Sequence, residues 1–145
     1  MIKLIDLLEN IQQNTIFPFQ EYDKSYDEND NSLLSVDYIF NTPKNKYKVI
    51  FYSGEYSPED KTFDLSFGIN TGELNKLNTF QMTGEGNVRA ILKTVAAIIE
   101  DFLNTYSKEA NTIIIDATDE KRRRVYKTLF PKYLSSNVLS KVIIK

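Results

Sequence analysis

Residues 81–117 read QMTGEGNVRAILKTVAAIIEDFLNTYSKEANTIIIDA. After the glycines, apolar residues recur with the period of an α-helix, and Asn87 stands before them as a good N-cap. The stripe consists of Val88, Ile91, Leu92, Val95, Ile98, Ile99, Phe102, Leu103 and Tyr106. The isoleucines at 113–115 then predict a strand buried on both faces, which is typical of an interior parallel strand.

Upstream of this stretch the hydrophobic pattern changes to a period of two. Segments 33–40, 47–52 and 63–69 are alternating or rich in β-branched and aromatic residues, with turn-forming residues between them. A fourth strand is predicted over about 76–82. This spacing predicts an antiparallel meander of about four strands. The last of them and the strand over 112–117 should be parallel and joined by a right-handed strand–helix–strand crossover.

The rest of the chain supports an α/β fold with a mixed sheet. Thr118 or Asp119 can cap a second helix that runs to about Leu134, and a last strand is predicted over 138–144. The length of 145 residues predicts a single domain.

The first part of the chain completes the predicted domain, 1–145. Helical spacing of apolar residues predicts an N-terminal helix over 1–14, packed on the sheet or on a partner. Crowded carboxylates predict a solvated acidic loop over 17–32.

Composition excludes several chemistries. The chain has no cysteine and no histidine, which removes thiol nucleophiles, Cys- or His-based zinc sites and Ser-His-Asp catalysis. The net charge of −2 gives no global basic field for nucleic acid. No secretory or membrane-spanning pattern is present, so we expect a cytoplasmic protein with no membrane association. Abundant Lys, Asn and Ile suggest an AT-rich source such as a phage, in which case the protein works in the bacterial host cytoplasm or in the virion.

The glycine turn before the long helix is the main candidate binding site. Its backbone N–H groups can face an anion at the positive end of the helix, and glycines allow close approach. The structural alternative is a sharp strand-to-helix turn with nothing bound. The candidate cofactor-binding residues are Gln81, Gly84, Glu85, Gly86, Asn87 and Val88.

The run Gln81-x-x-Gly84-x-Gly86 resembles the Gln/Arg-x-x-Gly-x-Gly/Ala signature of the GNAT acetyltransferase superfamily. The resemblance implies that this turn receives the pyrophosphate of acetyl-CoA. The helix that carries Tyr126 and Phe130 also resembles the family's Leu-Tyr-x-Lys-x-Gly-Phe run, which implies that Tyr126 protonates the departing CoA thiolate. Small tailed-phage proteins show a similar glycine turn and Arg-x-x-Leu/Val-Tyr helix.

Three functions follow from these patterns. The first is acyl transfer from an acyl-CoA to an amine acceptor, with a water or a residue of the acidic loop as base. The second is a catalytically silent structural or interaction module of a phage, with a phage or host protein as partner. Under the second, Tyr126 is an ordinary core aromatic with its hydroxyl at an edge.

The third function is association with nucleic acid through the chain's basic run. Lys121, Arg122, Arg123 and Arg124 could form a phosphate-binding patch. The alternative for this run is a solvated helix surface, balanced by Asp116, Asp119 and Glu120.

Overall fold

The computed structural model describes residues 16–70, 77–79 and 87–145. The predicted N-terminal helix over 1–14 therefore lies outside the described residues. So do four of the candidate cofactor-binding residues, Gln81, Gly84, Glu85 and Gly86.

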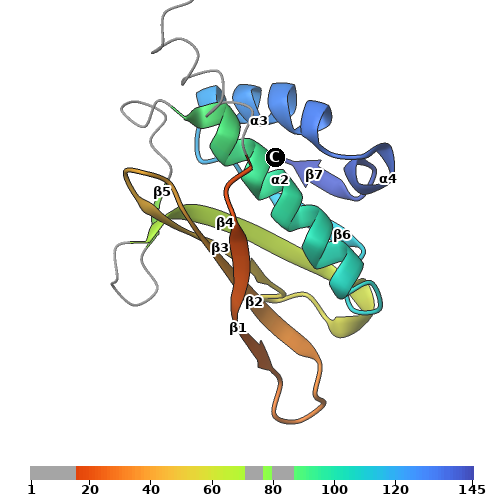
Figure 1. Cartoon of the computed structure of the whole chain (residues 1–145). Helices are drawn as coiled ribbons and strands as arrows, with labels where there is room; N and C mark the ends of the chain where they lie inside the picture. The colour runs from red at the N-terminus through yellow and green to blue at the C-terminus, as the bar shows by residue number, and fades with distance from the viewer. Residues whose placement is uncertain (1–15, 71–76, 80–86) are drawn as a thin grey trace, which may run out of the picture.

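The structure is an α/β fold built on one mixed seven-stranded sheet (Figure 1). The strand order is β1-β2-β3-β4-β6-β7, and β5 pairs with β4 outside this path. The strands are β1 Phe19–Tyr26, β2 Leu33–Asn41, β3 Lys46–Tyr52, β4 Thr62–Asn70, β5 Leu77–Thr79, β6 Thr112–Ile115 and β7 Val142–Ile144.

The predicted antiparallel meander is confirmed, and it begins one strand earlier than expected. The acidic loop predicted over 17–32 was wrong for most of its length, because β1 pairs antiparallel with β2 from Phe19↔Phe40 to Tyr26↔Leu33. β1 lies at the edge of the sheet and is exposed along most of its length, so charged side chains there remain in water while the backbone pairs. The remaining turn between β1 and β2 is non-strand, as expected.

The parallel part of the sheet differs from the prediction in its partners. β6 is parallel to β4 and to β7, whereas β5 is antiparallel to β4. The strand predicted over 76–82 is therefore not the parallel partner of 112–115. β5 and β6 pair with different parts of β4: β5 with 68–70 and β6 with 62–65. β4 thus changes partner along its length.

Three α-helices are described: α2 Val88–Thr105, α3 Glu120–Tyr133 and α4 Ser136–Leu139. A 3₁₀ turn, η1 Pro58–Asp60, lies between β3 and β4. The strand predicted over 138–144 shortens to β7, because Ser135 caps α4 by accepting a hydrogen bond from the Val138 N–H. None of the helices in the described part of the chain has the length and apolar character needed to span a membrane.

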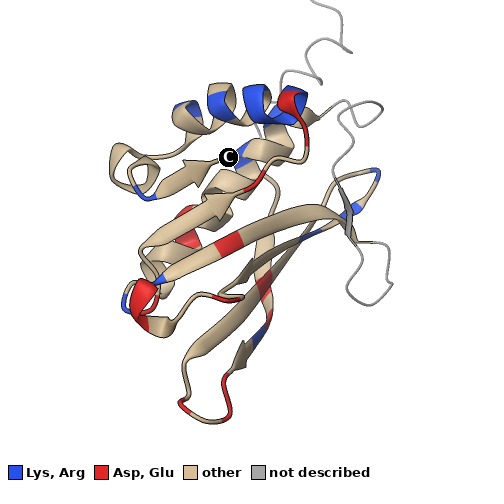
Figure 2. Ribbon diagram, turned by 180° about the vertical axis from the view of Figure 1, so that it is seen from behind, with Lys and Arg blue, Asp and Glu red and all other residues tan. Residues whose placement is uncertain are grey.

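The core lies between one face of the sheet and α2, and α3 packs beside α2 (Figure 1). Phe102 of α2 stacks on Phe51 of β3 with ring centroids 4.0 Å apart. No helix in the described residues covers the other face of the sheet (Figure 2). The middle isoleucine of β6, Ile114, is therefore only half-buried, although the sequence predicted burial on both faces.

Candidate functional site

A small cavity lies where the parallel strands β4 and β6 stop pairing. Its volume is about 100 Å³. In open α/β sheets, ligands bind at the carboxyl ends of parallel strands, where the topology changes. The pairing of β4 shifts from β6 to β5 at this point. The cavity is lined by Leu65, Ser66, Phe67, Ile115, Asp116, Thr118, Arg122 and Tyr126.

Tyr126 reaches this cavity from the first half of α3. Its side chain is 5% exposed, and its ring packs against Phe67 and Phe130 with centroids 5.8 and 5.6 Å away. Burial raises the pKa of the Tyr126 phenol, the positive charge of Arg122 opposes that shift, and Asp119 adds to it. The hydroxyl is therefore protonated at neutral pH and can donate a proton or a hydrogen bond. Both interpretations of Tyr126 from the sequence, core packing and placement at a site, fit this position.

Arg122 is held beside Tyr126 by the cap of α3. Asp119 caps the helix by accepting the Arg122 N–H at 2.7 Å, and its other oxygen lies 3.5 Å from Arg122 Nε. Arg122 also donates from Nη1 to the Thr118 hydroxyl. The Arg122 side chain is only 17% exposed. It therefore places a fixed guanidinium at the cavity, a group suited to carboxylate or phosphate.

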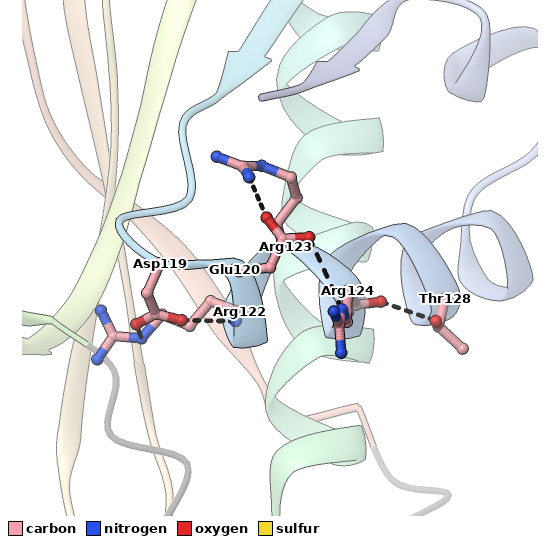
Figure 3. Close-up of polar contacts among 6 residues, drawn as sticks. All are labelled: Asp119, Glu120, Arg122, Arg123, Arg124 and Thr128. Carbon is pink, nitrogen blue, oxygen red and sulfur yellow. Dashed lines mark hydrogen bonds and ion pairs between the residues drawn. The ribbon is translucent and has the colours of Figure 1, made fainter.

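The other arginines of the basic run do not join Arg122. Arg123 pairs with Glu120, and Arg124 Nε lies 3.7 Å from the other oxygen of the same carboxylate. Figure 3 shows the three guanidinium groups pointing in three directions. Arg122 pairs with Asp119, whereas Arg123 and Arg124 share Glu120, so the structure does not bring the three arginines together in one patch.

The amino end of α2 lies at the same end of the molecule as that of α3 (Figure 1). Asn87 is the N-cap residue, and its carbonyl accepts the Ile91 N–H, but its side chain makes no capping hydrogen bond. Asn87 is nevertheless 7% exposed. Val88 is half-buried, and its side chain packs against the core.

Sequence reasoning missed Asp116 as a site residue. It was interpreted as a counter-charge for the basic run, yet it forms no ion pair with any described residue and lines the cavity instead. It also borders a second cavity of about 240 Å³, which includes Tyr52, Asp64 and Ile114 of the uncovered sheet face. Its position in the sequence, directly after a strand predicted to be buried, could have identified Asp116 as a site residue.

The chain belongs to a family described as "Family of unknown function (DUF6934)", whose model matches residues 20–144. No curated protein and no solved structure matches the chain.

Proposed function

We propose that the chain binds an acyl-CoA and transfers its acyl group to an amine, with Tyr126 as the general acid. The observation that supports this proposal is that Tyr126, Arg122 and Asp116 line one cavity, where the parallel pairing of β4 with β6 ends. Acyl transfer with general acid–base catalysis uses a proton donor and a base, and a nearby cation can stabilise the negative charge that develops.

The roles follow from the chemistry of each group. Asp116 takes a proton from the attacking amine nitrogen as that nitrogen bonds to the acyl carbon. Tyr126 gives its proton to the departing thiolate sulfur, and the proton held by Asp116 then returns to Tyr126 through water. The raised pKa keeps the phenol protonated until the sulfur leaves.

The cavity can accommodate only the reacting end of an acyl-CoA. The ligand supplies an activated thioester, and a cavity of about 100 Å³ can hold only a few of its atoms. The rest of the acyl-CoA would extend toward the start of α2. There the proposed contacts for the pyrophosphate are the backbone N–H groups of 84–88 and the side chain of Asn87, which makes no capping hydrogen bond.

The catalytically silent module is the second candidate, and the burial of Tyr126 favours it. A tyrosine that is 5% exposed and packed between Phe67 and Phe130 already has the surroundings of a core residue. In this case α3 serves to complete the core, and the fold acts as a scaffold for a protein partner.

Binding and catalysis can be tested separately. Millimolar acetyl-CoA should raise the melting temperature, because a ligand that binds only the folded state stabilises it. CoA release should then be measured with a panel of primary amines. Tyr126→Phe should lower that rate about 10²–10⁴-fold with an unchanged melting temperature. The matched control is Tyr133→Phe on the same helix, where the ring lies under Lys93.

The two candidates differ in their results. An unchanged melting temperature with acetyl-CoA removes the transferase and leaves the silent module. A shift without CoA release indicates binding without catalysis. The nucleic-acid function stays a prediction, and the separate pairing of Arg122, Arg123 and Arg124 gives it no support.

A further inference from the structure

A third, larger cavity lies at the start of β4, before the part of the strand that packs on Tyr126. Its volume is about 340 Å³, within the range of small-molecule sites. It is bordered by the β1–β2 turn, the loop between β3 and β4, and the segment that follows α2. These segments meet at one end of the sheet (Figure 1). Nothing in the proposed transferase reaction uses this cavity.

Unusual backbone conformations gather around this cavity. In the described residues, positive φ angles occur at Asn31 (58°), Gly54 (54°) and Lys61 (52°), and all three residues line it. The left-handed conformation is unfavourable for a lysine. Lys61 is held in it because its carbonyl accepts the N–H groups of Asn111 and Thr112. Such positions cluster at functional sites, where the surrounding structure fixes them.

Ser53 supplies an unused polar group at the cavity wall. It is 9% exposed, and its backbone N–H donates to the Leu34 carbonyl at 2.8 Å. Its hydroxyl makes no hydrogen bond with any described residue, although it lines the cavity. Because it lines the cavity and has no partner among the described residues, the Ser53 hydroxyl is available to a ligand.

The charges around the cavity are mixed. Lys61, Lys108 and Glu109 line it, and none of them forms an ion pair within the described part of the chain. Asp27 and Asp30 also line it, but they accept backbone N–H groups of their own turn. A simple anion would meet three carboxylates, and a simple cation would meet two ammonium groups. A ligand with one charge of each sign can place its anionic group beside the lysines and its cationic group beside a carboxylate.

Apolar side chains complete the wall. Leu33 and Phe63 are buried beneath the cavity, while Tyr26 is largely exposed and lines it too. We propose that this cavity binds a small zwitterion of the amino-acid type. Its carboxylate contacts Lys61, Lys108 and the Ser53 hydroxyl, its ammonium group contacts Glu109, and its side chain lies against the apolar wall.

Thermal melts of the full chain with each of the twenty standard amino acids at millimolar concentration test this proposal. At least one should raise the melting temperature. Its deamino acid and its decarboxylated amine should each give a clearly smaller shift. If no amino acid gives a shift, or if a single-charge analogue performs as well as the zwitterion, the proposal is overturned.

Variants then locate the site. Lys61→Asn keeps a residue that tolerates the left-handed conformation, and Lys108→Gln removes the other ammonium. Each should raise the dissociation constant of the amino acid that gives the largest shift about tenfold. Ser53→Ala should raise the dissociation constant less. The matched control is Lys127→Gln, an exposed lysine on α3. If the Lys127 variant weakens binding as much as the cavity variants, the amino acid binds elsewhere and the proposed site is wrong.

Discussion

The two faces of the sheet are built from alternate residues of the same strands, and they differ sharply. On the face under α2, Val36 pairs with Phe51 and both are fully buried. One position along, Asp37 pairs with Ile50 on the uncovered face, and both remain partly exposed. Burial on one face therefore coexists with a polar, solvent-accessible surface on the other.

The two faces of the sheet should therefore contribute differently to the stability of the fold. The covered face holds apolar side chains packed at interior density and should carry most of the folding free energy. The uncovered face carries isolated apolar residues, an ion pair and the rim of the cavity beside Asp116. Substitutions on the two faces should therefore have effects of very different size.

The largest contrast is expected between Phe102→Ala and Ile50→Ala. Phe102 is fully buried, stacks on Phe51 and meets Phe63 edge-on. Its truncation should cost about 3–5 kcal/mol of unfolding free energy, because a cavity remains. Ile50→Ala should cost about 1 kcal/mol. Urea unfolding measures both, and equal losses would contradict the expected difference between the two faces.

A second contrast compares two threonines on helices. The fully buried Thr94 hydroxyl donates to the Ala90 carbonyl and accepts the Phe17 N–H at 2.9 Å. Thr94→Val removes the acceptor of the Phe17 N–H and should cost about 1–3 kcal/mol. Thr128 makes the same bond to the carbonyl four residues before it, but it is exposed. Thr128→Val should change stability by less than about 0.5 kcal/mol, and a larger loss would contradict the contrast.

Alkaline pH should lower the unfolding free energy through buried tyrosines on the covered side of the sheet. Burial and a hydrogen bond to Asp101 raise the pKa of Tyr38. Burial and a hydrogen bond to Glu21 likewise raise the pKa of Tyr106. The unfolded chain releases these protons near pH 10 while the folded chain keeps them. The resulting stability is complete below that pH and is lost as pH rises above it.

Urea midpoints measured from about pH 8 to about pH 11 test this prediction. The steep alkaline loss should be reduced in Tyr38→Phe. Ile50→Val, on the uncovered face, removes no ionisable group, serves as the control and should keep the wild-type slope. Identical slopes in all three proteins would mean that Tyr38 does not contribute to the alkaline loss.

The smallest effect is expected for the ion pair on the uncovered face. Lys48 Nζ lies 3.4 Å from the Asp37 carboxylate, and both side chains remain partly exposed. Lys48→Gln should therefore cost less than about 1 kcal/mol, and the cost should shrink further in high salt. A salt-independent loss above that range would place this pair in a much drier environment than the exposed sheet face provides.

Local pattern predicted much of the fold. The stripe from Val88 to Tyr106 and the alternation of β2, β3 and β4 were confirmed as elements. Hydrophobic periodicity indicates which face of an element is buried. It therefore predicts elements that have one buried face and one exposed face. β1 was missed because its exposed, charged residues carry no such pattern.

Pairing and the site depend on distant residues. Nothing in the spacing shows that β6 pairs with β4 while β5 pairs with another part of β4. For this reason Tyr126 could be named from a motif, but its placement at the same cavity as Asp116 could not be predicted. The turn with Gln81 and the two glycines lies outside the described residues, so the cofactor contact proposed there stays a prediction.

The shared strand β4 has a consequence for the order of assembly. Tyr52 pairs with Asp64 only twelve residues later, whereas Thr62 pairs with Thr112 fifty residues later. Short loops close at a lower entropic cost and form sooner than long ones. During synthesis the meander can therefore be complete before β6 leaves the ribosome, and the parallel half then assembles on a finished template.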